Sequence, residues 1–342
     1  MVRPKLKDVA EKAGVSAATA SYVLNNKKKY ISEETKEKVF TAAKELGYIP
    51  DMNARGLASK DTRLIGVVIP QREPGSALMF RNQFYSEILG SIEYQARICG
   101  YQIIISGTDV NEDYVRLARE RNLDGVIAIG IYPDDFYEQF KEIGIPVVLV
   151  DSYCEDDGFH NIRSDDMYGG YLAAKYMLDR GHREIGFISG AILQDGVMKK
   201  RLLGYQKALE EYGILYRKEY VYEGAIEYEA GEMLAERIVQ DGRRITAVIA
   251  TADILAIGAV KGFTKSGWKV PEDISVIGFD GLEISQYLTP GLTTVQQNIA
   301  KKGERAVEIL LENFREEEMD IKDEILPITI AERESVMTLK ER

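Results

Sequence analysis

Three charged residues stand where they could hold a small polar molecule. Asp151 comes directly after the short apolar run Val147–Val150, and Arg201 and Asp280 follow two further runs of this kind. An arginine and carboxylates together offer donors and acceptors to neighbouring hydroxyl groups, which is how a polyol is held. Because ligands of open α/β sheets bind beyond the carboxyl ends of the strands, we expect these three side chains to converge on a ligand.

The residues needed for metal or triad chemistry are scarce. Cys99 and Cys154 are the only cysteines, and His160 and His182 are the only histidines. A zinc site or a Ser-His-Asp triad needs a histidine beside its partners, and His182 lies in a turn that favours a structural role. Phosphate-cradling glycine motifs are absent from the sequence. We therefore expect no metal, no cofactor and no enzymatic activity, although a pair of carboxylates acting on a glycosidic bond stays an open alternative.

The elements that must position these residues are strands alternating with helices. Short apolar segments rich in β-branched residues recur along the chain, and amphipathic stretches of helical length separate them. Buried strands that alternate with helices favour parallel sheets covered on both faces. Two such sets predict an α/β fold with two doubly wound subdomains. The predicted strands are 64–69, 102–106, 125–129, 147–150, 185–189, 247–250 and 275–278.

The charge of the chain is divided unevenly. The 342 residues carry a formal charge of −11, yet residues 1–60 hold 12 Lys and Arg against 7 Asp and Glu, a net charge of +5. Charges more than about 10 Å apart are largely screened at ordinary salt, so the local sign decides attraction to phosphates. The basic segment therefore suits a nucleic-acid partner, and a solvated lysine-rich surface is the alternative.

The basic segment has the pattern of three short helices. Apolar positions at helical spacing begin at Leu6 and stop before Gly14, which supplies a left-handed helix end. Ser16 is a good N-cap for a second helix, and Ser32 is one for a third helix, which Gly47 ends. The first two helices and the tight turn between them meet the steric demands of a helix-turn-helix.

Several motifs together resemble the lac repressor family of bacterial transcription regulators. Each motif alone is modest, but their order and spacing are highly specific and cover nearly the whole chain. In the basic segment and after it the motifs are 7–16, 46–50 and 53–58. Further along the chain they are 64–70, 180–185, 270–280 and 292–295.

The resemblance implies a three-helix DNA-binding head over residues 1–51, a hinge helix over 52–61 and a body over 62–342. The body is expected to be of the periplasmic-binding-protein type, to bind an effector and to dimerise. The chain is expected to cross between its two subdomains three times, near 160, 290 and 323. The N-subdomain then comprises about 62–160 and 291–322, and the C-subdomain about 161–290 and 323–342.

The resemblance also implies which residues contact DNA. The recognition helix begins with Ala17 and Ala18, which cannot make bidentate hydrogen bonds to bases, and Tyr22 stands where the family usually has an arginine. In the hinge, Leu57 matches an apolar wedge that two subunits insert into the minor groove. The expected DNA contacts, with the lysines on phosphates, are Lys5, Ser16, Ala17, Ala18, Thr19, Ser21, Tyr22, Asn25, Lys27, Lys28, Lys29, Asn53, Ala54 and Leu57.

By position, Arg201 and Asp280 resemble the two main ligand contacts of the family. Ile226 stands where the family often has an aromatic ring that would stack on a sugar, and Ala252 replaces an amide, which leaves Asp253 as the candidate there. The expected effector contacts are Phe84 and Tyr85, for which core packing is an equal alternative, and Asp151, Arg201, Ile226, Asp253 and Asp280.

These observations predict a homodimeric, cytoplasmic DNA-binding regulator that acts as a repressor. It would bind a pseudo-palindromic double-stranded operator, and a small ligand between the subdomains, a sugar or sugar derivative, would control that binding. No apolar run approaches the roughly 18 residues that a membrane span needs, so no membrane partner is expected. Two alternatives stay open, a sugar-binding transport receptor and a cytoplasmic sugar-acting enzyme built on the same body.

Overall fold

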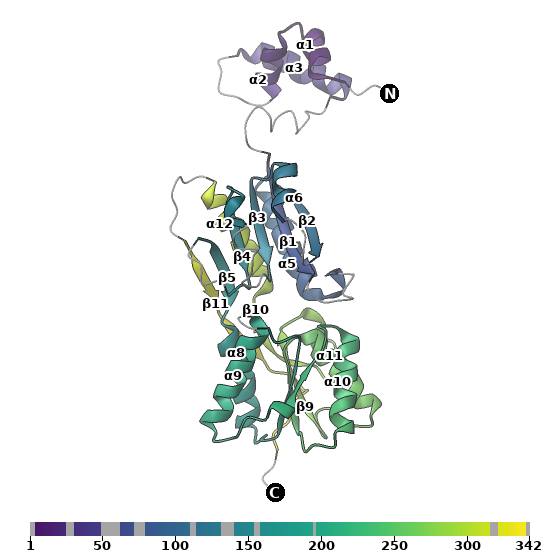
Figure 1. Cartoon of the computed structure of the whole chain (residues 1–342). Helices are drawn as coiled ribbons and strands as arrows, with labels where there is room; N and C mark the ends of the chain where they lie inside the picture. The colour runs from purple at the N-terminus through teal and green to yellow at the C-terminus, as the bar shows by residue number, and fades with distance from the viewer. Residues whose placement is uncertain are drawn as a thin grey trace. The chain divides into compact units, whose positions relative to one another are not determined.

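The computed structural model of the chain falls into two compact units, Met1–Thr62 and Arg63–Arg342, which are called the head and the body below. The expected hinge, 52–61, lies outside the described residues and stays a prediction. The structure describes residues 4–24, 31–48, 62–71, 79–109, 114–130, 140–153, 158–193, 196–314 and 321–339 (Figure 1).

Three helices pack around a small apolar core in the head. They are α1 (Leu6–Ala13), α2 (Ala17–Leu24) and α3 (Glu33–Leu46). Gly14 and Gly47 take the left-handed conformation after α1 and α3, and the Ser16 hydroxyl oxygen accepts a hydrogen bond from the Thr19 N–H at the start of α2 (3.0 Å). The predicted helix-turn-helix is therefore confirmed. Its buried residues are Val9, Ala10, Ala20, Val23, Val39, Ala42 and Ala43.

The first sheet of the body has six parallel strands in the order β11-β5-β4-β3-β1-β2. Helices α5 (Gln83–Ile98) and α12 (Ile299–Asn313) share a core with Val67 on one face, and Val68 packs in a second core with Ala118 of α6 (Tyr114–Arg121). Successive residues of β1 thus serve opposite faces, as a buried strand requires. The strands are β1 (Leu64–Gln71), β2 (Gln102–Asp109), β3 (Gly125–Ile129), β4 (Val147–Val150), β5 (His160–Ser164) and β11 (Asp323–Leu326).

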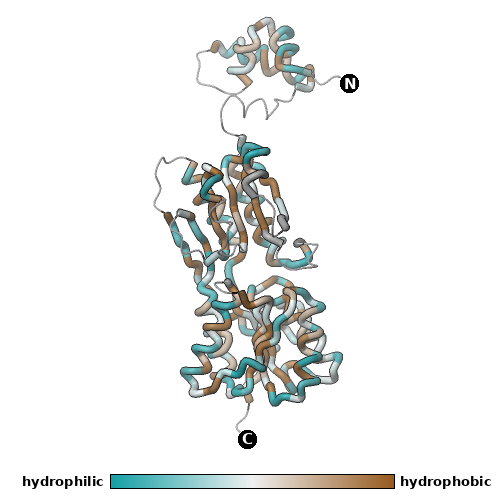
Figure 2. Tube along the Cα trace, viewed as in Figure 1, coloured by the Kyte–Doolittle hydropathy of each residue, from teal (hydrophilic) through white to brown (hydrophobic). Residues whose placement is uncertain are grey.

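The second sheet has the order β12-β10-β9-β8-β6-β7, with β12 antiparallel to β10 and the other pairs parallel. Helices α8 (Asp166–Asp179) and α9 (Val197–Glu211) cover one face, and α10 (Tyr228–Gln240) and α11 (Asp253–Lys265) cover the other (Figure 1). The central strands of both sheets are mainly hydrophobic (Figure 2). The strands of the second sheet are β6 (Ile185–Ser189), β7 (Val221–Glu223), β8 (Ala247–Ala250), β9 (Ser275–Asp280), β10 (Thr293–Gln297) and β12 (Ile328–Ala331). Three short 3-10 helices are η1 (Met79–Arg81), η2 (Lys218–Tyr220) and η3 (Glu283–Gln286).

All seven predicted strands are present. β3, β4, β6 and β8 have the predicted bounds, and β1, β2 and β9 extend two or three residues further. The sequence pattern missed β5, β7, β10, β11 and β12. These strands are short or lie next to a sheet edge, so they lack the continuous apolar run that marks a central strand.

The chain crosses between the two sheets later than the sequence predicts. β5 pairs with β4 in the first sheet, so the first crossing lies at 164–166 and not near 160. The sequence assigns residues from 291 onward to the N-subdomain, but β10 pairs with β9 in the second sheet, which moves the second crossing to 297–299. The third crossing lies at 326–328. Strand pairing therefore fixes these boundaries.

Two glycines allow α8 and α9 to approach closely. A Cβ atom on Gly204 of α9 would lie 1.9 Å from the Met167 carbonyl oxygen, and one on Gly170 of α8 would lie 2.0 Å from the Arg201 carbonyl oxygen. Any larger residue would have to separate the two backbones. This close packing brings the first turn of α8, which carries Asp166, against Arg201 on α9.

Candidate effector site and DNA-binding head

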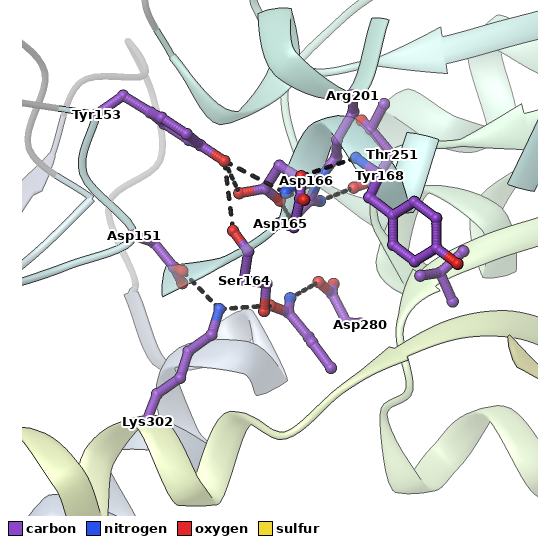
Figure 3. Close-up of polar contacts among 12 residues, drawn as sticks. Asp151, Tyr153, Ser164, Asp165, Asp166, Tyr168, Arg201, Thr251, Asp280 and Lys302 are labelled. Carbon is purple, nitrogen blue, oxygen red and sulfur yellow. Dashed lines mark hydrogen bonds and ion pairs between the residues drawn. The ribbon is translucent and has the colours of Figure 1, made fainter. Parts of the chain in front are cut away.

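Arg201 extends from α9 into a buried position where its guanidinium group has several partners. Its Nε donates a hydrogen bond to Asp166 Oδ1 at 2.8 Å, and its Nη1 donates to the carbonyl oxygen of Thr251 (Figure 3). Its Cζ lies 3.5 Å from the centre of the Phe279 ring, a cation–π contact. The guanidinium is therefore fixed in orientation before any ligand arrives.

A second chain of contacts joins the two subdomains. Gln297 Nε2 donates to Asp280 Oδ1 at the end of β9 (2.7 Å), and Lys302 Nζ of α12 donates to Gln297 Oε1 (2.5 Å) and to Asp151 Oδ1 after β4 (2.5 Å) (Figure 3). The residues of these two sets of contacts are called the junction network below. They are Asp151, Asp166, Arg201, Asp280, Gln297 and Lys302.

Tyr153, which follows β4, and Ser164, at the first crossing, extend this network. The Tyr153 hydroxyl donates to Asp166 Oδ2 (2.8 Å), and the Ser164 hydroxyl donates to Gln297 Oε1 (3.2 Å). Arg163 Cζ and Lys200 Nζ each lie 5.1 Å from the centre of the Tyr153 ring. The first and second crossings thus meet at one polar cluster.

The structure brings together three residues that the sequence predicted to converge, namely Asp151, Arg201 and Asp280. Sequence reasoning missed three other members of the junction network. Asp166 and Gln297 gave no motif signal, but Lys302 could have been found. It lies three residues after Ile299, on the apolar face of α12 and not on a charged one.

Asp253 makes contacts within the fold that the sequence did not predict, and its contact with an effector stays a prediction. Its side chain is fully buried, and Oδ2 accepts hydrogen bonds from the N–H groups of Gly281 (3.0 Å) and Leu282 (2.8 Å) and from the hydroxyl of Ser285 (2.7 Å). Oδ1 accepts from the hydroxyl of Thr294 (2.6 Å). Because both carboxylate oxygens are engaged within the fold, Asp253 holds the turn after Asp280, which argues against a ligand contact.

The three apolar candidates lie in partly buried positions. Phe84 and Tyr85 follow the Asn82 N-cap of α5, form an edge-to-face pair with centres 5.5 Å apart, and pack on the core of the first sheet. Ile226 packs on the core of the second sheet and fills the space beside Gly190. A Cβ atom added to Gly190 would lie 2.6 Å from the Cγ1 atom of Ile226. Core packing therefore applies to all three, and their contact with an effector stays a prediction.

Burial disfavours ionisation of several carboxyl groups here. Burial raises the pKa of Asp280, although the positive charge of Arg201 lowers it. Burial also raises the pKa of Asp253, although the four hydrogen bonds to its carboxylate lower it. Burial also raises the pKa of Asp151, although Lys302 pulls it the other way. The nearby cations therefore do not fully compensate the loss of solvation.

Two of the predicted contacts have unusual backbones. Asp151, which directly follows β4, has φ 52°, and Asp280, the last residue of β9, has φ 127°. Positive φ values cost free energy in residues other than glycine, and such strain is concentrated at functional sites. The surrounding contacts with Lys302 and Gln297 hold both carboxylates in place despite this cost.

The predicted DNA contacts in the head are accessible to different degrees. Lys5, Ser16, Ala17 and Ala18 are exposed, whereas Thr19, Ser21 and Tyr22 are half-buried. The start of the recognition helix thus presents two small apolar side chains. The remaining predicted contacts lie outside the described residues: Asn25, Lys27, Lys28, Lys29, Asn53, Ala54 and Leu57.

Both histidines make contacts within the fold. His182 Nδ1 lies 3.0 Å from the hydroxyl of Thr246 and its Nε2 lies 3.1 Å from the carbonyl oxygen of Met337, while His160 Nδ1 accepts from the Lys322 N–H. Within the described ranges, no group of three or more His, Cys, Asp and Glu side chains could hold a metal ion. None of the helices in the described part of the chain is long and apolar enough to span a membrane.

Models of two protein families match the two units. One, described as bacterial regulatory proteins of the lacI family, matches residues 5–51, and the other, a periplasmic binding protein-like domain, matches residues 174–336. A helix-turn-helix head joined to a binding-protein body defines a transcription regulator that responds to a small ligand.

Known repressors are similar to this chain over nearly their whole length. The HTH-type transcriptional repressor PurR of Vibrio campbellii is 35% identical over 322 residues, 92% of each chain. The PurR repressor of Erwinia tasmaniensis is 36% identical over 341 residues, 97% of this chain and 96% of that one. The chain therefore belongs to the lacI family of bacterial regulatory proteins, and it is a ligand-controlled transcriptional repressor.

Solved structures agree with this assignment. A lac repressor dimer bound to operator and to the anti-inducer ONPF superimposes with a TM-score of 0.85 at 27% identity and covers 98% of this chain and 100% of that one. A complex of the transcriptional regulator CelR with cellobiose gives a TM-score of 0.71 at 27% identity and covers 97% of this chain and 100% of that one.

Proposed function

We propose that the effector of this repressor binds at the junction network and that its binding changes the affinity of a homodimer for operator DNA. The observation that carries the proposal is the unbroken chain of contacts from Asp280 of the second sheet to Asp151 of the first. A ligand that contacts both ends of such a chain has different affinities for two arrangements of the subdomains. Only a differential affinity of this kind can shift an equilibrium between conformations.

The chemistry of the network suits a ligand with several hydroxyl groups. Arg201 presents a fixed planar group of donors. Asp280 accepts one hydrogen bond on each oxygen, from Gln297 Nε2 (2.7 Å) and from the Asp253 N–H (3.4 Å), and each oxygen keeps a lone pair for a ligand donor. One structural neighbour was solved with cellobiose. We therefore propose a carbohydrate effector. We also propose that Ile226 contacts the sugar at the position where the family often has an aromatic ring.

We propose that the head reads a pseudo-palindromic operator as part of a homodimer. Exposed Ala17 and Ala18 suit apolar contacts with thymine methyl groups, and Tyr22, four residues after Ala18 on the same helix, supplies a polar side chain. One structural neighbour is a repressor dimer on its operator. The proposed partner is chromosomal DNA, which is why we also propose a cytoplasmic location.

The proposal can be tested by measuring operator binding in the presence of sugars. DNA affinity selection first identifies the operator, and fluorescence anisotropy then measures its dissociation constant with and without each sugar. We expect one sugar to change operator affinity 5- to 150-fold, the range of typical allosteric coupling. Asp280→Asn should bind operator normally and lose this response. Turnover of the sugar by the purified protein, or a full response in the variant, would refute the proposal.

A further inference from the structure

Lys302 has an unusual position for a lysine. It lies on the buried face of α12 between Ile299 and Ala306, and its side chain is fully buried. An ammonium group in such a place is strongly disfavoured unless charged and polar partners replace its water. Asp151 Oδ1 and Gln297 Oε1 supply them, each 2.5 Å from Nζ. Lys302 is therefore a cation whose charge is already neutralised within the protein.

The charge of Arg201 is neutralised in the same way. Its partner Asp166 is 1% exposed and lies 2.8 Å away, so the pair is fully internal. Asp253 and Asp280 are buried as well, but neither forms an ion pair with a described residue. The two buried cations, Arg201 and Lys302, thus lie among four aspartates, Asp151, Asp166, Asp253 and Asp280.

Two further cations lie close to the Tyr153 ring, Arg163, which is paired with Asp323 (2.7 Å), and Lys200. Lys200 has no ion pair with a described residue. It is half-buried on α9, and its Nζ faces the Tyr153 ring at 5.1 Å. Tyr153 in turn donates its hydroxyl hydrogen to Asp166. An anionic ligand would have to rely on this side chain, so any test of charge preference must include it.

We propose that the effector is an uncharged polar molecule and that the Lys302–Asp151 ion pair enforces this, because no buried cation of the described residues is left unpaired for a phosphate or carboxylate group. The inference rests on the proposed function, which puts the ligand at the junction network. A hydroxyl group can donate to Asp280, whereas an anionic oxygen would face that carboxylate while the nearby Arg201 is already paired with Asp166. Sugar phosphates and sugar acids are therefore excluded as effectors, and free sugars are accepted.

The ion pair also makes the inference testable by substitution. Asp151→Asn keeps the size of the side chain but removes its charge, so Lys302 is left as an unpaired cation. This variant should bind inorganic phosphate. In the double variant Asp151→Asn with Lys302→Met the cation is gone, and a methionine fits the apolar face of α12. Phosphate binding should be lost again.

The experiment compares wild type, Asp151→Asn, the double variant and Lys200→Gln by thermal unfolding and calorimetry. The probes are inorganic phosphate against sodium chloride at equal ionic strength, and glucose against glucose 6-phosphate and glucuronate. We expect no saturable phosphate binding in the wild type and at least tenfold tighter phosphate binding in Asp151→Asn than in the double variant. If glucose binds the wild type, both charged forms should bind at least tenfold more weakly.

Two results would overturn the inference. One is tight binding of phosphate or of a charged sugar to the wild type, whether or not Lys200→Gln abolishes it. The other is a folded Asp151→Asn variant that gains no affinity for phosphate. If that variant does not fold, the wild-type comparison of phosphate with chloride decides. The proposed function fails separately, when no ligand of any charge changes operator affinity.

Discussion

Arg201 Nε donates a 2.8 Å hydrogen bond to Asp166 Oδ1, and both side chains are almost completely buried. The arginine proposed as the main ligand contact is therefore also half of an internal ion pair. Loss of Arg201 should therefore have two separable effects, a loss of ligand binding and a loss of stability. Stability is lost because removal of one member of a buried pair leaves the other charge without a partner.

The Arg201→Ala variant should have a free energy of unfolding about 3–5 kcal/mol below that of the wild type. Chemical denaturation measures this difference. The matched variant Arg201→Ala with Asp166→Asn removes both charges and should recover a large part of the lost stability. Equal stability of the single and double variants would show that the ion pair is not the cause.

Arg201→Lys tests the ligand role with less structural damage. Lysine keeps the positive charge for Asp166 but lacks the planar fork, which binds two oxygens at once. We expect this variant to bind operator with wild-type affinity. We expect its dissociation constant for the effector to rise at least tenfold, so that more ligand is needed for the same response. Isothermal calorimetry with the identified effector provides the measurement, and unchanged ligand affinity would make Arg201 a purely structural residue.

The close approach of α8 and α9 gives a prediction with an internal control. Gly204→Ala would put Cβ 1.9 Å from the Met167 carbonyl oxygen, so the helices must separate, at a cost of about 3 kcal/mol. Gly90→Ala lies in α5, where an added Cβ meets no atom within 4 Å, and should stabilise the helix by about 0.5–1 kcal/mol. Urea unfolding of the two variants should move in opposite directions, and a shift of the same sign would count against the described packing.

The pH dependence of stability should report on Asp280. Burial raises its pKa, so the folded state holds the proton more tightly than the unfolded state. The resulting stabilisation is complete below the ordinary carboxyl pKa of about 4 and is lost as pH rises through the raised pKa. We expect the melting temperature of the wild type, relative to that of Asp280→Asn, to fall as pH rises above about 4. Burial lowers the pKa of His160 and His182, which gives the opposite trend, but both variants share them. A difference in melting temperature between the two proteins that stays the same at every pH would contradict this account.

The head should separate base recognition from phosphate binding. Tyr22→Ala should change which operator variants are selected, whereas Lys5→Gln should weaken binding to all sequences alike and reduce the salt slope by about 1. Binding selection on a randomised operator measures the first effect, and titrations at several salt concentrations measure the second. Unchanged base preference in Tyr22→Ala would show that another residue reads the operator.

Much of the fold could be predicted because local patterns coincide with burial. The runs that form β3 and β8 are wholly buried, and an apolar run is all that identifies them. β11 lies at the edge of its sheet and β5 lies next to it, and they contain His160, Arg163 and Asp323, so their sequences lack that signal. Their pairing depends on contacts between residues about 160 positions apart, which periodicity cannot reveal.

The site was only partly predictable, for a different reason. Strand ends marked Asp151 and Asp280, because the carboxyl ends of parallel strands meet at one edge. Strand ends could not reveal that Asp253 turns towards Gly281 and Ser285, or that Asp166 reaches Arg201 across a pair of packed helices. Those roles depend on side-chain directions that follow only from the packing of the second subdomain.

The apolar interiors of the head and the body have no residue in common. The core of the head is built from residues between Leu6 and Tyr48, and the four cores of the body use residues from Leu64 onward. A substitution that retunes operator choice therefore leaves the interior of the effector domain intact, and the converse also holds. Recombination between related genes at the boundary between the two units, Thr62 and Arg63, should therefore yield folded chimaeras. New pairings of signal and promoter can then arise in evolution without repacking either interior.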